Sequence, residues 1–129
     1  MDSEYVETVL DVVELVPPGC VTTYGDVAAV VAGLLGRGGP RQVGTALREA
    51  GGAVPWWRVV GAAGLPPEHK RTVALDALRA EGCPLRDGDR VDMRRARADL
   101  EALAAAGVAP SREVRVAPSR EVAGESRGR

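Results

Sequence analysis

The chain has 129 residues, 27% of them charged, and a formal net charge of −1 at pH 7. These values predict one soluble globular domain and argue against a nonspecific polycation. No basic N-terminal stretch or long apolar run occurs, so we expect a cytoplasmic protein without a signal peptide or membrane span. Cys20, Cys83 and His69 lack metal-ligand spacing. We therefore expect no metal, no cofactor and no Cys-His nucleophile pair.

Charge is distributed unevenly along the chain. Residues 1–36 contain six acidic and no basic side chains, whereas residues 37–107 contain twelve basic and nine acidic ones. The tail from Val108 contains five arginines and three glutamates. An acidic N-terminal segment and a basic central segment can fold so that one face of the protein is positive and attracts a polyanion. A solvated surface of mixed charge is the alternative, and composition alone favours it.

The first 35 residues predict two helices. Apolar residues at helical spacing indicate one from about Ser3, which can cap it, to Val16. Pro17-Pro18-Gly19 ends this helix. Its predicted apolar stripe comprises Val6, Val9, Leu10, Val13 and Val16. A capping box in Thr23-Tyr24-Gly25-Asp26 then predicts a second helix from about Gly25 to Leu35.

A third helix is predicted from Pro40, a residue suited to the first helical position, to about Ala50. Two short helices joined by a glycine-rich turn form the helix-turn-helix pattern. The predicted inner face comprises Val43, Ala46, Leu47 and Ala50.

Donors suited to nucleic acid lie on the opposite face of this third helix. Arg41, Thr45 and Arg48 share a narrow arc, and Gly44 flanks it, where a missing side chain lets a phosphate backbone approach. We interpret the helix as one that contacts nucleic acid. An ordinary solvated face with two arginines is the alternative that the pattern leaves open.

Both tryptophans stand side by side in Pro55-Trp56-Trp57-Arg58, within a segment predicted to be extended from Val54 to Val60. Adjacent residues of an extended segment point to opposite sides, so at most one tryptophan faces a single core. One hypothesis is an aromatic wall for a flat ligand such as a nucleobase. The other is one core tryptophan with a half-exposed neighbour.

The second half of the chain predicts smaller elements. A helix is expected from about Pro67 to Glu81, a short strand at Val91-Asp92-Met93 and an alanine-rich helix from Asp99 to Ala106. The buried side of the first of these is predicted to comprise Val73, Ala74, Ala77 and Leu78. Residues 108–129 contain the repeat Val-Ala-Pro-Ser-Arg-Glu-Val and are predicted to be disordered.

Four motifs occur in an order that resembles the DNA-binding domain of O6-alkylguanine-DNA alkyltransferases over about residues 5 to 95. They are Pro18-Gly19 with Thr23–Ala28, then Pro40–Ala46, then Pro55–Val60, and then Glu81-Gly82. The transferases carry Pro-Cys-His-Arg where this chain has Pro55-Trp56-Trp57-Arg58. In them the cysteine accepts the alkyl group, and a histidine held by a glutamate helps to deprotonate it through water.

The resemblance places Trp56 at the nucleophile, Trp57 at the base and Glu81 at the glutamate. An indole nitrogen has no accessible lone pair, so we expect no alkyl transfer and no enzyme. The chain thus resembles the alkyltransferase-like proteins, although their commonest motif is Pro-Trp-His-Arg and Trp57 departs from it. The resemblance implies a mainly α, winged-helix-like or helix-turn-helix domain over residues 1–107, with a short extended Trp-Trp-Arg segment and residues 108–129 as a tail.

The resemblance also implies roles for individual residues. Arg41 would enter the duplex in place of a flipped base, and Tyr24 would press on the target phosphate. The recognition helix would lie in the minor groove. The implied DNA-binding residues are Tyr24, Arg41, Gln42, Gly44, Thr45 and Arg48. The implied lesion pocket comprises Trp56, Trp57, Arg58, Val59 and Leu65.

We therefore expect a monomer that recognises O6-alkylguanine in double-stranded DNA and directs the site to nucleotide excision repair proteins. One alternative is a transcriptional regulator that reads sequence in the major groove through Arg41, Gln42, Thr45 and Arg48. Another is a protein-interaction module with exposed tryptophans.

Overall fold

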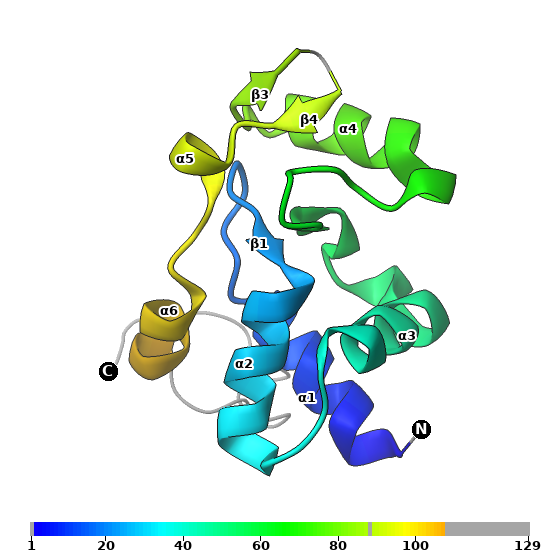
Figure 1. The fold of residues 1–129 in the computed structure, drawn as a ribbon, viewed down its shortest axis with the longest axis vertical. Coiled ribbons are helices and arrows are strands. Elements are labelled where there is room, and N and C mark those ends of the chain that lie inside the picture. Colours follow the sequence, from blue (N-terminus) through cyan, green and yellow to red (C-terminus); the bar gives the residue numbers. More distant parts are fainter. Residues whose placement is uncertain (1, 88, 108–129) are drawn as a thin grey trace.

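The computed structural model describes residues 2–87 and 89–107, and its lower part in Figure 1 is a layer of helices. Helices α1, α2 and α3 pack against one another, and α6 lies against α2. Their bounds are Ser3–Val13 for α1, Tyr24–Leu35 for α2, Pro40–Ala50 for α3 and Leu100–Gly107 for α6. The tail that the sequence predicts to be disordered lies outside the described residues.

Short elements and one longer helix form the upper part of the molecule (Figure 1). Strand β1 pairs in parallel with β2, and β3 pairs antiparallel with β4. The bounds are β1 Thr22–Thr23, β2 Val59–Val60, α4 Arg71–Ala80, β3 Leu85–Arg86, β4 Arg90–Val91 and α5 Met93–Ala96. Three 3₁₀ helices are η1 Gly51–Ala53, η2 Trp56–Arg58 and η3 Glu68–Lys70. No helix in the described part of the chain is long and apolar enough to cross a membrane.

Two apolar clusters stabilise these two parts. The first lies among α1, α2 and α3 and includes Val9 and Val43, whereas the second joins β2, α4 and the hairpin and includes Leu78. Burial of each such side chain contributes roughly 1.5–3 kcal/mol. Trp56 packs against the first cluster and Trp57 against the second. The two tryptophans therefore face different cores, and η2 joins the two parts of the fold.

The helix-turn-helix elements begin close to where the sequence places them. Thr23 caps α2 by accepting a hydrogen bond from the backbone N–H of Asp26 at 3.0 Å, and α2 begins one residue earlier than predicted. Gly36 ends α2 with a φ of 75°, a conformation that favours glycine. Helix α3 spans the predicted range, but Ala50 in its last turn is exposed, because the chain turns away into η1 there.

The prediction for α1 is right about its first residue, Ser3, but wrong about its cap and its end. Asp2 rather than Ser3 is the N-cap, since its carboxylate accepts a hydrogen bond from the N–H of Tyr5 at 2.8 Å. Aspartate and serine cap equally well, so residue type alone could not separate them. The helix ends at Val13 because the two prolines that follow Val16 disfavour helical geometry before them.

The prediction of an extended segment from Val54 to Val60 is also wrong. Residues Trp56–Arg58 form a 3₁₀ turn, closed by a hydrogen bond from the N–H of Val59 to the carbonyl of Trp56. Only Val59–Val60 are strand, and they pair with β1. Tertiary contacts of the two indoles and of Arg58 determine this local shape.

Helix α4 presents a different face to the core from the one predicted. It begins at Arg71, after the separate turn η3, and ends at Ala80. Leu75 is buried and Val73 is 60% exposed, although the sequence predicts Val73 on the buried side. The hairpin also differs, because β4 ends at Val91 and Met93 begins α5.

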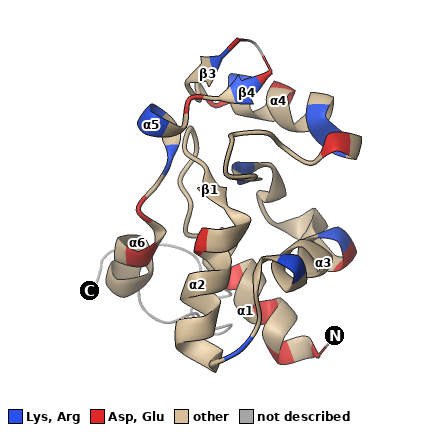
Figure 2. Cartoon of the chain, in the orientation of Figure 1, with Lys and Arg blue, Asp and Glu red and all other residues tan. Residues whose placement is uncertain are grey.

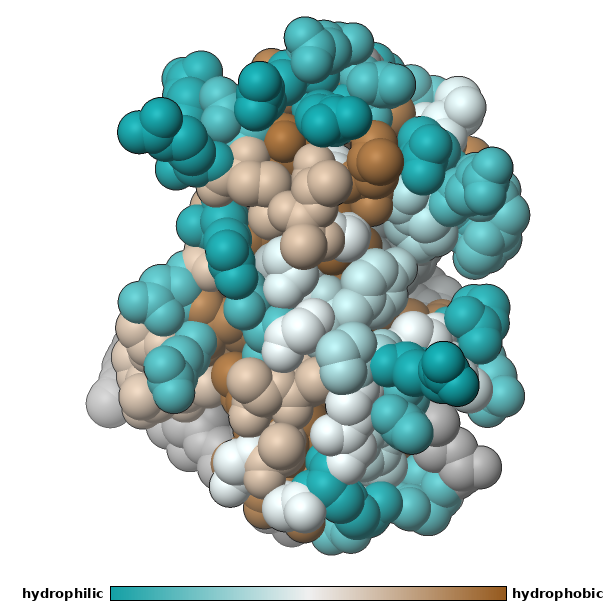
Figure 3. Space-filling model, viewed as in Figure 1, coloured by the Kyte–Doolittle hydropathy of each residue, from teal (hydrophilic) through white to brown (hydrophobic). Residues whose placement is uncertain are grey.

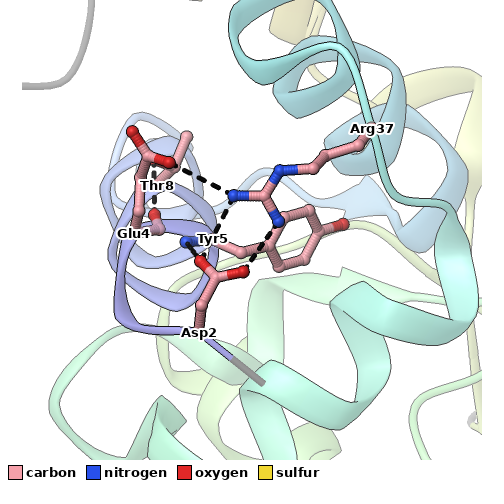
Figure 4. A network of polar contacts seen from close by, with 5 residues as sticks. All are labelled: Asp2, Glu4, Tyr5, Thr8 and Arg37. Atoms are coloured by element: carbon pink, nitrogen blue, oxygen red, sulfur yellow. Dashed lines mark hydrogen bonds and ion pairs between the residues drawn. The ribbon is translucent and has the colours of Figure 1, made fainter.

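A polar network ties the turn before α3 to the start of α1 (Figure 4). Arg37 donates to Asp2 at 2.8 Å and to Glu4 at 3.2 Å, and its guanidinium lies 5.6 Å from the ring centroid of Tyr5. The hydrogen bond from Arg37 is the main reason that the pKa of Asp2 falls to about 2. These exposed pairs add little stability, and they link the turn before α3 to α1.

Candidate nucleic-acid interface

The outer face of α3 carries side chains that differ in how they are held. Arg41, in the first turn, is exposed and makes no ion pair or side-chain hydrogen bond within residues 2–87 and 89–107. Thr45 donates to the carbonyl of Arg41 at 3.1 Å and accepts from Arg48 at 3.3 Å. The side chain of Gln42 accepts from the N–H of Gly39 at 3.0 Å, so its carbonyl oxygen is used in capping α3. Arg41 is thus the side chain with most freedom to reach a ligand.

Tyr24 lies beside α3 at the first position of α2. A Cβ on Gly44 would lie 4.0 Å from its ring and 3.9 Å from Arg48, both ordinary contact distances. Gly44 therefore opens access to the Tyr24 ring without being required by packing. Burial raises the pKa of Tyr24, which outweighs the opposite effect of Arg48. The phenol is neutral at neutral pH and can donate a hydrogen bond to a phosphate oxygen.

A pocket of about 100 Å³ lies where α3, η2 and the chain before α4 meet. It is lined by Tyr24, Gly44, Leu47, Arg48, Trp56, Pro67, His69 and Lys70. In Figure 3 the outline of the molecule is indented between the hydrophilic side chains over α3 and those over the start of α4. The lining contains no carboxylate, and Arg48 and Lys70 make it positive.

One aromatic face dominates this pocket. The ammonium of Lys70 lies 4.8 Å from the ring centroid of Trp56, a cation–π contact worth roughly 0.5–1 kcal/mol at an exposed site. Trp56 is partly buried, and a Cβ added to Gly51 would lie 3.6 Å from the Cβ of Trp56. A flat ligand can therefore reach Trp56 from the side that the flexible Lys70 side chain covers.

Trp57 and Arg58 form a second cluster around Glu81, beside the pocket rather than within it. The indole N–H of Trp57 donates to Glu81 at 2.9 Å, and Arg58 donates to the same carboxylate at 2.6 Å. Arg58 also donates to the carbonyl of Val16 at 2.9 Å, and the N–H of Gly19 donates to Glu81 at 3.1 Å. Three chain segments meet at this carboxylate: the turn after α1, η2 and the end of α4.

The Glu81 carboxylate is stabilised in its charged form. Burial by itself raises its pKa, but the hydrogen bonds from Arg58, Gly19 and Trp57 together lower it below the ordinary value. With side-chain exposures of 13% for Arg58 and 15% for Glu81, the pair is shielded from solvent. Removing one partner of such a pair leaves a desolvated charge, which is strongly destabilising.

Of the predicted lesion-pocket residues, Trp56 lines the pocket and four do not. Trp57 and Arg58 contact Glu81 instead, and Val59 is fully buried because it pairs with β1. Leu65 closes the loop after β2, where its carbonyl accepts from the N–H of Gly61 at 2.9 Å. Among the predicted DNA-binding residues, Tyr24, Gly44 and Arg48 line the pocket, and Arg41, Gln42 and Thr45 lie elsewhere on α3.

Sequence reasoning missed the pocket residues Pro67, His69 and Lys70. The only available signal was the polar pair His69-Lys70 near the start of a predicted helix, and that pattern is common on solvated surfaces. Another hollow, of about 430 Å³, lies between α2 and the chain leading into α6. It contains three carboxylates and none of the predicted site residues, so it is a poor site for a polyanion. Among the described residues, no group of His, Cys, Asp or Glu side chains converges to hold a metal ion.

Comparison with protein families places this geometry in context. Residues 4–83 match the family described as 6-O-methylguanine DNA methyltransferase, DNA binding domain. This match covers more than half of the chain. The chain belongs to this family.

Individual relatives make the comparison more specific. The chain is 34% identical over 105 residues to a DNA base-flipping protein of Escherichia coli strain K12, which covers 74% of this chain and 75% of the relative. A DNA base-flipping protein of Shigella flexneri matches with the same identity and coverage.

One solved structure shares the fold. S. pombe Atl1, in complex with damaged DNA containing O6-carboxymethylguanine, matches with a TM-score of 0.65 and 25% identity. The match covers 77% of this chain and 98% of Atl1. The predicted mainly helical, helix-turn-helix class and the resemblance to alkyltransferase-like proteins are confirmed. The names of these relatives are consistent with a protein that is not an enzyme.

Proposed function

We propose that this chain recognises O6-alkylguanine in duplex DNA by rotating the modified nucleotide into the pocket at Trp56, without accepting the alkyl group. The observation that carries the proposal is the position of the pocket. An indole wall with positive side chains stands at the outer face of the recognition helix, and no thiol lines the pocket. Base-flipping and damaged-DNA relatives support the same activity for this chain.

Arg41 is the residue that we assign to the vacated position in the duplex. Nucleotide flipping costs a few kcal/mol of stacking, which a planar guanidinium recovers in part by stacking on neighbouring bases. Because the Arg41 side chain makes no ion pair or hydrogen bond within the described residues, its movement into DNA breaks none there. The neutral phenol of Tyr24 would donate to the phosphate of the rotating nucleotide.

The extruded base would stack on Trp56 after Lys70 moves aside. Stacking of a base on an aromatic side chain contributes roughly 1–3 kcal/mol, more than the contact between Lys70 and the indole. The free pocket is smaller than the roughly 300 Å³ typical of ligand sites, so binding requires the side chains of η3 that line it, Lys70 among them, to move aside.

The absence of transfer follows from the chemistry of the side chains present. Indole carbon and nitrogen atoms are poor alkyl acceptors compared with a thiolate. Cys83 is buried, and burial raises the pKa of its thiol to about 11, so it is protonated at neutral pH. We propose that the protein acts as a monomer and that the distorted duplex then directs nucleotide excision repair proteins to the site.

A fluorescence experiment tests the flipping step. Pyrrolocytosine placed opposite O6-methylguanine brightens when its partner leaves the stack. Saturating protein should raise its fluorescence, and intact-mass spectrometry should show a protein of unchanged mass after incubation. Full binding with unchanged fluorescence would contradict flipping, and addition of one methyl group to the protein would contradict recognition without transfer.

A further inference from the structure

The proposed function leaves Trp57 without a role, although this second tryptophan lies directly beside the pocket wall. It contacts Glu81 and does not line the pocket. Its position corresponds to the histidine of the transferase motif, so an indole stands here in place of an imidazole. The contacts of that indole indicate what it does.

Trp57 is anchored at one end by a charged group. Its N–H donates to Glu81 at 2.9 Å, and the guanidinium of Arg58 lies 5.6 Å from its ring centroid. Glu81 is held in turn by Arg58 and by the backbone N–H of Gly19. A hydrogen bond to a charged acceptor is about twice as strong as one between neutral groups.

This anchored ring meets Trp56. The two ring centroids are 5.9 Å apart and the planes lie at 85°, an edge-to-face pair. Such a pair is directional, because its attraction depends on the angle between the rings. Trp56 also packs against the first apolar cluster, and its cation–π partner within the described residues is the exposed Lys70. Trp57 is therefore the anchored aromatic neighbour that limits rotation of the Trp56 ring toward the pocket.

We propose that Trp57 is a positioning residue whose hydrogen bond to Glu81 holds Trp56 at the angle on which a flipped base stacks. This inference rests on the proposed function, because it concerns the same pocket. The indole takes the place of the histidine and supplies the donor to Glu81. Specificity for the modified base thus depends on a side chain that does not line the pocket.

Two substitutions separate the hydrogen bond from the bulk of the ring. Trp57→Phe keeps an aromatic ring but removes the donor, whereas Trp57→His restores an N–H that can reach Glu81. Trp57→Phe should weaken binding to an O6-methylguanine duplex about tenfold, which equals about 1.4 kcal/mol, and leave binding to the unmodified duplex unchanged. Trp57→His should restore wild-type affinity to within about twofold, a difference of roughly 0.4 kcal/mol.

Fluorescence provides a readout that loss of stability alone would not move. Trp56 is the sole tryptophan in both variants. In the folded protein, its fluorescence anisotropy should fall and its quenching by acrylamide should rise in Trp57→Phe but not in Trp57→His. Val73→Ala, at an exposed site on α4, is the matched control and should change none of these quantities.

Wild-type lesion affinity in Trp57→Phe, or affinity in Trp57→His as weak as in Trp57→Phe, would overturn the inference. If Trp57→Phe does not unfold cooperatively, benzothienylalanine at position 57 keeps the bicyclic shape and removes only the N–H. Full lesion affinity of that variant would overturn the inference equally. Lack of lesion preference in the wild-type protein would instead contradict the proposed function itself.

Discussion

Three side chains at the interface differ in how strongly neighbouring residues restrain them. The least restrained one is the residue whose proposed role requires the largest movement. Arg41 has no partner within the described residues, Arg48 is tied to Thr45, and Trp56 is supported by Trp57. A residue that must enter the duplex gains from freedom, whereas a stacking surface gains from being fixed before the base arrives. Arg41 is therefore free to move into the duplex, whereas Trp56 is held in place before a base stacks on it.

Arg41→Ala should weaken binding to an O6-methylguanine duplex by at least tenfold, because an inserted guanidinium no longer recovers part of a flipping cost of about 2–4 kcal/mol. Its unfolding midpoint in urea should match that of the wild-type protein, since Arg41 is exposed and makes no ion pair or side-chain hydrogen bond within the described residues. Arg94→Ala, on the exposed surface of α5, is the control of equal charge change. Wild-type lesion affinity in Arg41→Ala would remove the finger role.

The charged state of Glu81 makes the free energy of unfolding depend on pH. Its pKa is lower in the folded protein than the ordinary value of 4.5, so its stabilising effect is present above that value. The effect is lost as the pH falls through the folded pKa. Glu81→Gln should lower the free energy of unfolding by about 2 kcal/mol at neutral pH, and the difference from wild type should shrink below pH 4.5. Urea unfolding across this range measures it, and a difference independent of pH would contradict the ionised cluster.

At the element scale, the turn between α2 and α3 fixes how the recognition helix is presented. Gly38 has a φ of 94°, and an added Cβ would overlap the ring of Tyr5, a buried residue of α1. Arg37 joins the same turn to Asp2 and Glu4. The close approach of backbone to Tyr5 therefore positions the start of α3, with Arg41 in its first turn.

Gly38→Ala and Gly33→Ala form a matched pair that tests this role. Gly38→Ala should lower the free energy of unfolding by more than about 2 kcal/mol, through backbone strain and overlap with Tyr5. Gly33 lies within α2 with nothing within 4 Å of an added Cβ, so Gly33→Ala should raise stability by about 0.5–1 kcal/mol. Thermal unfolding of both variants measures these changes, and equal effects would contradict the close approach at Gly38.

The sequence predicted the helix-turn-helix well because its signals are local. The Thr23 cap, Pro40 at the first position of α3 and the apolar spacing of Val43 and Leu47 each act within a few residues. The 3₁₀ turn at Trp56–Arg58 could not be predicted in this way, since its shape depends on Glu81, more than twenty residues later.

The same limit applies to the candidate site. The tryptophan motif indicated Trp56, but an aromatic pair in an isolated segment does not show which ring faces the pocket. Lys70 was missed because its contact with Trp56 joins two separate 3₁₀ turns, η3 and η2. Val73 shows the same effect in α4, where tertiary packing buries Leu75 and leaves Val73 exposed.

At the scale of the whole molecule, charge is separated although the net charge is only −1. Figure 2 shows acidic residues on α1 and basic residues on α3 and around the β3–β4 hairpin. The positive pocket lining lies on the α3 side. Attraction to DNA is therefore local and orients the protein with α3 toward the duplex.

Salt dependence tests this orientation. Each basic side chain that neutralises a phosphate steepens the fall of log K with log salt by about 0.9. Arg48→Ala should therefore reduce the slope by about 1 in titrations of the unmodified and the modified duplex alike. Arg94→Ala on α5 is the control and should leave the slope unchanged. An unchanged slope in Arg48→Ala would place the phosphate contacts on another face.

The most direct measurement is a fluorescence anisotropy titration of wild-type protein and Trp56→Ala with two duplexes that differ only in one O6-methyl group. Stacking worth roughly 1–3 kcal/mol predicts that the wild-type protein binds the modified duplex at least tenfold more tightly. Trp56→Ala should lose most of this preference while it retains affinity for the unmodified duplex. Equal affinity of the wild-type protein for both duplexes would contradict recognition of the lesion in the Trp56 pocket.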